Sequence, residues 1–359
     1  MMSIKTFLKS HQATDYWLRC FMNCRDPRFV ETVRAIGRDP NLLYFERRGE
    51  EHPDVSFYDV YIDCPSKGFF ALLLQTLDAL RYAQRFHLTP VVRWGDRCLY
   101  KESEQIFGAD DPFEYFFEPV NGFTAADMEK AARVLLYCDG QRAFDRDHAF
   151  GVASKTIVER GIYEEYIAAN AETYRAHIRL KGHVKDRICE GMARLGVNAD
   201  SNILGVHVRA TDFNNAYVGH ARAVTLEEYI AATRRALEAH EFEGVFLATD
   251  DAGVVEYFSQ GLGRSVLCYN DVFRSTDGAA VHFSKARRPY HNFEMGVEVL
   301  RDMYTLSRCS GLIGSYSNVC IAAQIVRKSE GGKYEYLHII DKGFNTTGQT
   351  TYQAHYSRH

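Results

Sequence analysis

A short apolar run in the second half of the chain ends in residues that could bind a phosphate. Residues 203–208 are apolar apart from His207, and Arg209, Thr211 and Asp212 follow. The run is typical of a strand buried on both faces, and a loop is expected after it. A guanidinium at such a strand end can hold a phosphate through paired hydrogen bonds. Alone, the pattern favours a core histidine and a surface ion pair between Arg209 and Asp212.

Two further strand-like runs, 244–249 and 265–268, also end in polar side chains. The side chains at these two ends, which could accept hydrogen bonds from a ribose or a base, are Thr249, Asp250, Asp251, Asn270 and Asp271. Because Asp residues cap helices in many proteins, either strand end alone would carry little weight. Paired carboxylates such as Asp250 and Asp251 could also hold a cation, although helix capping is the simpler interpretation.

A fourth run, 311–314, leads into Ser315, Ser317 and Asn318, which open a helix expected over 319–328. Hydroxyl, amide and backbone donors at a helix N-terminus favour a phosphate. In an open parallel sheet, ligands bind outside the carboxyl ends of the strands. Four polar strand ends on one sheet edge therefore favour a ligand site over four unrelated caps.

The first half of the chain contributes one weaker signal. A strand over 58–62 and a helix over 70–86 flank the turn Lys67-Gly68-Phe69, and the next strand is expected over 91–94. A helix N-terminus with a glycine beside it can hold an anion, although one glycine also fits an ordinary turn. The glycine signatures of dinucleotide and Walker A sites are absent from the sequence, which excludes a standard NAD or ATP site.

The alternation of strands and helices predicts an α/β fold with parallel, doubly wound sheets. Within the second half, Thr225 and Glu228 form the capping box of one expected helix. The polar stretch 196–202 is the expected domain junction. We therefore expect an N-terminal α/β domain over 1–198, a C-terminal Rossmann-like domain over 199–345 and a tail over 346–359.

Composition narrows the class of protein. The chain of 359 residues is 46% hydrophobic and 25% charged, as average globular proteins are. A net charge of −4 gives no basic surface for nucleic acid. No apolar run approaches the roughly 18 residues of a transmembrane segment, and the N-terminus lacks the apolar core of a signal peptide. The nine cysteines complete no zinc set and fit free thiols, so we expect a cytoplasmic protein.

Three blocks of sequence resemble the motifs of GDP-fucose-dependent fucosyltransferases. They are His207-Val-Arg-Ala-Thr-Asp212, Leu247-Ala-Thr-Asp-Asp251 and Ser307-Arg-Cys-Ser-Gly-Leu-Ile-Gly-Ser-Tyr-Ser-Asn-Val-Cys320. Their order and spacing agree with the family across about 203–328. The pattern is most similar to the α-1,6-fucosyltransferases, including the rhizobial nodulation enzyme, and is more distantly similar to protein O-fucosyltransferases. The turn at Gly68 and Phe69 resembles the N-terminal donor loop of the family.

The resemblance implies two Rossmann-like domains of the glycosyltransferase B type, with donor and acceptor in an interdomain cleft. It implies a bacterial, metal-independent enzyme without a cofactor, which transfers fucose from GDP-fucose to a hydroxyl of an oligosaccharide or other glycan acceptor. The implied reaction is an inverting displacement at an oxocarbenium-like carbon. Stabilisation of the negative charge on the leaving diphosphate should make the largest contribution to catalysis.

The resemblance also implies roles for individual residues. Arg209 would neutralise the β-phosphate of GDP while the glycosidic bond breaks, and His207 would lie against the nucleotide. The guanine would be read by Asn270 or Asp271. Ser317 and Asn318 would hold the phosphates.

Two departures from the family pattern concern the chemistry. Ala210 stands where the nearest relatives carry a second arginine, which removes a charge-assisted phosphate contact worth roughly 1.5–3 kcal/mol. His220 occupies the place where a catalytic glutamate is expected, so we hypothesise that it is the general base. An exposed loop histidine is an equal alternative for His220. Asp212 could substitute as the base, although at this position it more naturally fixes the loop or Arg209.

Other functions stay open on the sequence alone. The chain could use another nucleotide sugar as donor, and Ala210 also fits a non-catalytic protein that binds a nucleotide or glycan. Lys285, Arg287 and Arg288 could close over the diphosphate or meet an anionic acceptor, or form a solvated loop.

Overall fold

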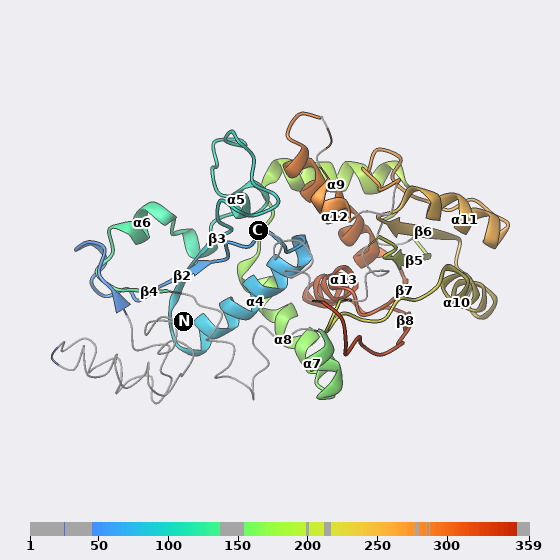
Figure 1. Ribbon diagram of the computed structural model, residues 1–359, viewed down its shortest axis with the longest axis horizontal. Coiled ribbons are helices and arrows are strands. Elements are labelled where there is room, and N and C mark those ends of the chain that lie inside the picture. The colour runs from blue at the N-terminus through green and yellow to red at the C-terminus, as the bar shows by residue number, and fades with distance from the viewer. Residues whose placement is uncertain are drawn as a thin grey trace. The chain divides into compact units, whose positions relative to one another are not determined.

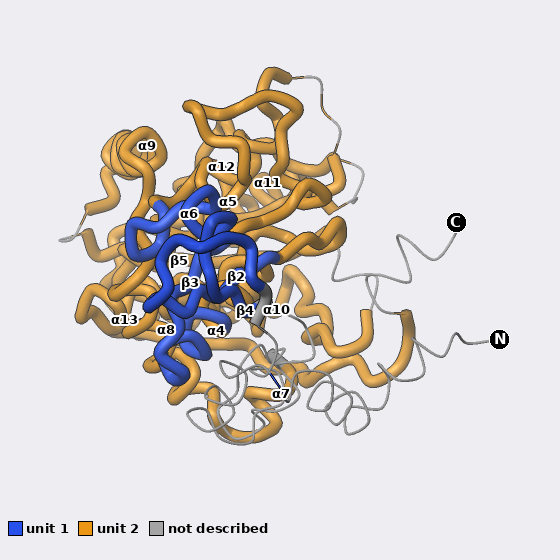
Figure 2. The backbone as a smooth tube through the Cα atoms, turned by 90° about the vertical axis from the view of Figure 1, so that its left-hand side faces the viewer, with its two compact units in different colours: residues 1–61, 79–92, 119–150 blue, residues 62–78, 93–118, 151–359 orange. Residues whose placement is uncertain are grey.

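The computed structural model describes residue 25 and residues 45–136, 154–198, 201–211, 217–276, 280–284, 286 and 288–349. These residues form two compact units, coloured separately in Figure 2. The first unit holds the described residues of 1–61, 79–92 and 119–150, and the second holds those of 62–78, 93–118 and 151–359. The domain division at residue 198 stays a prediction.

The first sheet has four strands in the order β1-β4-β2-β3. Its strands are β1 Phe45–Glu46, β2 Phe57–Tyr61, β3 Thr89–Arg93 and β4 Val134–Leu136. β4 is parallel to β2 and antiparallel to the short edge strand β1. The strands expected over 58–62 and 91–94 are thus confirmed within two residues, and helix α4, Phe69–Arg85, connects them as expected.

The second sheet lies wholly in the second unit and has the order β6-β5-β7-β8. Its strands are β5 Ile203–Val208, β6 Gly244–Thr249, β7 Gly311–Gly314 and β8 Tyr336–Ile339, and each adjacent pair is parallel. All six residues of β5 are buried, which confirms the central strand inferred from its apolar run. The prediction of a strand over 265–268 is wrong. Leu267 forms one bridge to β6, and the chain then turns at Tyr269, so no ladder develops.

Four helices accompany the second sheet (Figure 1): α10 Leu226–Ala239, α11 Ala252–Leu262, α12 His291–Arg308 and α13 Asn318–Ser329. The capping box of α10 is present, because Thr225 Oγ1 accepts from the Glu228 N–H and the Glu228 carboxylate accepts from the Thr225 N–H. Alternate residues of β5, such as Val206, form one core cluster with residues of α10 and α11.

Helix α12 packs against the other residues of β5. The Cβ position of Gly205 lies 3.0 Å from Leu306 and 3.2 Å from Cys309, so any larger residue would have to displace these neighbours. The residues alternate because successive side chains of a strand point to opposite faces. His207, two residues after Gly205, therefore points to the α12 face of the sheet.

The other helices of the described residues are shorter or lie outside the second sheet. They are α5 Pro112–Phe116, α6 Ala125–Glu129, α7 Ser154–Glu159, α8 Tyr163–His177 and α9 Gly182–Arg194, with 3-10 turns at Val120–Gly122 and Val281–Phe283. Of these, α6 and the turn Val120–Gly122 belong to the first unit. Within the second unit, α8 packs on α13 and α9 packs on α12. None of the helices in the described ranges is long and apolar enough to cross a bilayer.

Candidate functional site

Asp250 joins the first two sequence motifs at the carboxyl edge of the second sheet. Its Oδ1 accepts a hydrogen bond from the Ala210 N–H at 2.9 Å, and its Oδ2 accepts from the Thr211 hydroxyl at 2.7 Å. Asp250 follows β6, whereas Ala210 and Thr211 follow β5. The carboxylate therefore fixes the loop that carries Arg209. The structure places Asp250 as a support of this loop.

His207 and Ser317 join the first and third motifs. Ser317 Oγ caps α13 by accepting from the Cys320 N–H at 3.2 Å, and it lies 3.1 Å from His207 Nδ1. The serine hydroxyl can donate to Nδ1 or accept from it, because its oxygen has a second lone pair and the imidazole has two neutral tautomers. Both side chains are buried, with 6% and 1% of their surface exposed.

Ser315 and Asn318 complete the turn before α13. Ser315 is fully buried, and its carbonyl oxygen accepts from the Ser317 N–H at 2.7 Å. Asn318 is the first residue of the helix and is half-buried. The structure thus gives Ser315 a part in shaping the turn and leaves Asn318 at the helix N-terminus.

Arg209 lies within electrostatic range of Tyr100, whose hydroxyl binds the start of α4. This start, residues 69–78, belongs to the same compact unit as Arg209. Burial raises the pKa of Tyr100 well above its usual value, and the positive charge of Arg209 lowers it. The Tyr100 hydroxyl accepts from the Phe69 N–H at 2.9 Å. Tyr100 therefore holds the Gly68-Phe69 turn within electrostatic range of the guanidinium of the first motif.

The two residues of this turn have different surroundings. The Phe69 ring is 2% exposed and makes edge contacts with Trp94, Tyr100 and Phe116 at centroid distances of 5.2, 5.2 and 4.9 Å. Phe69 thus anchors the turn. The nearest atom to the Cβ position of Gly68 is His282 Nδ1, at 3.9 Å, so Gly68 leaves its side of the turn open.

Thr249 and Asp251 order the end of β6. Asp251 is the N-cap of α11 and accepts from the Gly253 N–H at 2.8 Å, while Thr249 Oγ1 accepts from the Asp251 N–H at 3.3 Å. The Thr249 carbonyl oxygen accepts from Arg274 Nε at 3.2 Å. In the described part of the chain, no three His, Cys, Asp or Glu side chains gather as a metal site would require.

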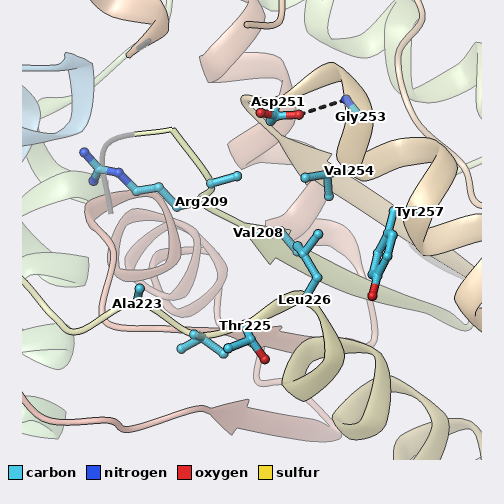
Figure 3. A pocket seen from close by; sticks show the side chains of 11 residues that line it. Val208, Arg209, Ala223, Thr225, Leu226, Asp251, Gly253, Val254 and Tyr257 are labelled. Carbon is cyan, nitrogen blue, oxygen red and sulfur yellow. Dashed lines mark hydrogen bonds between the residues drawn. The ribbon is translucent and has the colours of Figure 1, made fainter. Parts of the chain in front are cut away.

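A pocket of about 470 Å³ opens beside Ala210, between the N-termini of α10 and α11. Leu226, Val254 and Tyr257 contribute to its walls (Figure 3). The Arg209 side chain extends away from Val254 and Tyr257, so its guanidinium is directed out of this pocket (Figure 3). The pocket and the guanidinium therefore face different parts of the protein.

The two predicted base-reading residues, Asn270 and Asp271, lie in the turn after Tyr269. Arg301 of α12 donates to both carboxylate oxygens of Asp271, at 3.0 and 2.5 Å, and lowers the pKa of Asp271. The same guanidinium lies 4.0 Å from the centroid of the Tyr269 ring. Asn270 is exposed. The carboxylate of Asp271 is thus engaged within the protein, whereas the amide of Asn270 faces outward.

Asp302 of α12 is a polar residue that the sequence reasoning missed. It is 7% exposed, and its Oδ1 has no hydrogen-bond partner among the described residues. Burial raises the pKa of Asp302 to about 7, against the opposing charges of Arg274 and Arg301. A sequence signal existed, because Glu298, Arg301 and Asp302 stand among apolar residues in the middle of this helix. Perturbed carboxyls of this kind gather at functional sites.

The proposed base and its loop are only partly described. Asp212 lies outside the described residues. The segment of His220 is paired with the C-terminal part of the chain, since the His220 carbonyl oxygen accepts from the Asn345 N–H at 2.9 Å. The His220 ring lies 5.5 Å from that of Tyr217. The catalytic role of His220 stays a prediction.

The basic residues of the loop before α12 are also only partly described. Lys285 and Arg287 lie outside the described residues. Arg288 donates to both carboxylate oxygens of Glu298 and, at 2.8 Å, to His291 Nδ1. Arg288 thus anchors this loop to α12.

The chain is similar in structure to fucosyltransferases. It is 22% identical to fucosyltransferase NodZ from Bradyrhizobium, covering 75% of this chain and 92% of that chain, with a TM-score of 0.44. NodZ α-1,6-fucosyltransferase soaked with GDP-fucose gives 23% identity, 76% and 92% coverage and a TM-score of 0.45. The chain is 12% identical to POFUT1 in complex with GDP-fucose. This match covers 81% of this chain and 100% of that chain, with a TM-score of 0.44. No family model matches the sequence, and no curated protein matches it.

Proposed function

We propose that this chain is an inverting glycosyltransferase that transfers fucose from GDP-fucose to a hydroxyl of a glycan acceptor. One observation carries the proposal: side-chain hydrogen bonds interlock the three fucosyltransferase-like motifs at the carboxyl edge of one parallel sheet. Asp250 joins the second motif to the first, and Ser317 joins the third to the first through His207. This edge is where open parallel sheets bind their ligands.

The diphosphate of the donor is expected between Arg209 and the N-terminus of α13. Arg209 supplies a fixed positive charge, His207 supplies its imidazole ring, and the helix beginning at Asn318 supplies backbone donors and its dipole. As the sugar carbon separates from the diphosphate oxygen, the electron pair stays on that oxygen. Donors fixed around the growing negative charge lower the barrier.

The buried carboxyl of Asp302 favours guanine over uracil as the base of the donor. An ionised carboxylate can accept two parallel hydrogen bonds, and guanine offers a neighbouring ring N–H and amino group for them. Uracil lacks that pair of donors. Asn270 and Asp271 stay candidates for the base, but the carboxylate of Asp271 is held by Arg301, whereas Asp302 Oδ1 has no described partner.

The acceptor side of the reaction follows from the motif resemblance. The glycan hydroxyl attacks the sugar carbon on the face opposite the diphosphate, which inverts the configuration. Its proton goes to a base, for which His220 is our proposal and Asp212 the alternative. Two Rossmann-like domains with an intervening cleft, independence from metal and a cytoplasmic, bacterial setting belong to the same proposal.

Ala210 favours a second candidate function, a protein of this fold that binds a nucleotide or glycan without turnover, or that uses another nucleotide sugar. Calorimetric titration separates these possibilities when GDP and UDP are added to wild type and to Arg209→Ala. We expect GDP to bind, UDP to give no heat, and Arg209→Ala to lose GDP. Preference for UDP would replace GDP-fucose by another donor. GDP binding without release of GDP from GDP-fucose, over a panel of glycan acceptors, would establish the non-catalytic function.

A further inference from the structure

The turn before α4 faces a histidine from a distant part of the sequence. His282 belongs to the 3-10 turn Val281–Phe283, and its Nδ1 lies 3.9 Å from the Cβ position of Gly68. Both residues belong to the second compact unit. The imidazole therefore stands opposite the open side of the Gly68-Phe69 turn.

The fold itself does not require glycine at position 68. Gly68 is not among the residues with a left-handed backbone, and a Cβ there would make only an ordinary contact with His282. Alanine is thus compatible with the local structure. A glycine that neither backbone angle nor packing demands is expected where a ligand approaches the backbone closely.

A positive charge also lies near the same turn. The Tyr100 hydroxyl accepts from the Phe69 N–H, and the positive charge of Arg209 lowers the pKa of Tyr100. The turn also begins α4, a helix of 17 residues with a positive dipole end. The first motif nevertheless carries a single guanidinium, because Ala210 follows Arg209. A second donor toward a diphosphate has to come from another segment.

The turn that carries His282 is held in place. Within it, the Phe283 N–H donates to the Ala280 carbonyl oxygen at 3.0 Å and the Ser284 N–H to that of Val281 at 2.9 Å. A few residues on, Arg288 is bound to Glu298 and His291 at the start of α12. These bonds fix the backbone from which the His282 imidazole extends.

We propose that His282 donates a hydrogen bond to the leaving diphosphate of the nucleotide sugar, across the Gly68 turn from Arg209. This inference rests on the proposed function. In the reaction, the bond from the sugar carbon to the diphosphate oxygen breaks and its electron pair stays on that oxygen. The acceptor oxygen forms the new bond and gives its proton to the base. His282 keeps its proton and stabilises the charge.

The test compares His282→Ala and His282→Asn with wild type, using GDP titration and release of GDP from GDP-fucose. A hydrogen bond to a charged group is worth enough for roughly a tenfold to hundredfold effect. We expect His282→Ala to weaken GDP binding about tenfold and to slow release further, because charge grows on the diphosphate. The Asn amide nitrogen occupies about the place of Nδ1, so His282→Asn should stay within about threefold of wild type. His338→Ala, on β8, is the matched control.

Gly68→Ala provides a second test that does not disturb the fold. We expect an unchanged melting temperature and a loss of GDP binding of about tenfold or more, since the methyl group fills the gap a phosphate would enter. If Arg209→Ala loses GDP while His282→Ala and Gly68→Ala bind and turn over like wild type, the inference about His282 falls and the proposed function stands. If wild type binds neither GDP nor GDP-fucose, both fall together.

Discussion

Ser317 Oγ lies 3.1 Å from His207 Nδ1, which ties the N-cap of α13 to the penultimate residue of β5. The same oxygen accepts from the Cys320 N–H. One hydroxyl thus caps a helix and holds the ring of a buried histidine. Ser317 therefore positions the imidazole that His207 offers to a ligand.

Removing this hydroxyl has two expected effects. Ser317→Ala should lower the free energy of unfolding by about 1 kcal/mol through loss of the cap. It should also weaken GDP binding several-fold, because the His207 ring loses the hydrogen bond that positions it. Ser317→Thr keeps the hydroxyl and should preserve both properties in denaturant unfolding and calorimetry. Equal GDP affinity in Ser317→Ala and wild type would count against this role.

Asp250 is expected to act through the loop after β5. Asp250→Ala leaves the Ala210 N–H and the Thr211 hydroxyl without their carboxylate partner, at a cost of about 1–3 kcal/mol. The loop carries Arg209, so GDP binding should fall along with stability. Urea unfolding and GDP titration measure both quantities, with the exposed Glu238→Gln as control. A stable Asp250→Ala variant with normal GDP affinity would refute this coupling.

Asp302 gives stability a defined dependence on pH. Its pKa is about 7 in the folded protein, above the 3.8 of an ordinary aspartate, so the folded state holds a proton that the unfolded state has lost. Stability from this group is therefore lost as the pH rises from about 4 to about 7, by at most ~1.4 kcal/mol per pH unit. Asp302→Asn should remove that slope in urea titrations at a series of pH values.

The same carboxyl predicts a pH effect on ligand binding. If ionised Asp302 accepts from guanine, GDP affinity should rise through pH 7 and level off above it, and Asp302→Asn should bind GDP weakly at every pH. The pH series of calorimetric titrations should include Glu238→Gln, which should follow wild type. A GDP affinity that falls toward pH 7 in wild type would exclude the ionised carboxyl as the base acceptor.

The crossing of β5 and α12 can be tested by one methyl group. Gly205→Ala would place Cβ 3.0 Å from Leu306 and 3.2 Å from Cys309, which demands movement of a packed core. Overpacking of this kind costs typically about 1–3 kcal/mol. Gly182, at the start of α9, has open space around its Cβ position. Thermal unfolding should therefore show a lower Tm for Gly205→Ala and little change for Gly182→Ala.

Sequence periodicity predicted the second sheet and its helices because their signals are local. The apolar run of β5 and the capping box of α10 each lie within a few residues, and both are confirmed. The hydrogen bonds that position the site residues join residues that lie far apart in the sequence. The bonds of Phe69 to Tyr100 and of Asp271 to Arg301 span 31 and 30 residues, and no periodicity records them.

Burial likewise escaped the sequence reasoning where a polar residue occupies an apolar position. Asp302 is buried although aspartate is usually exposed, so the spacing of apolar residues does not identify it as a core position. The strand expected over 265–268 failed for the opposite reason, since its apolar residues find one bridge to β6 and no second partner.

The most direct test of this account is the structure of the protein crystallised with GDP. The account predicts the β-phosphate within hydrogen-bond distance of Arg209 and His207 Nε2, before the N-terminus of α13. GDP bound elsewhere, for example in the pocket between α10 and α11, with Arg209 and His207 apart from it, would contradict it.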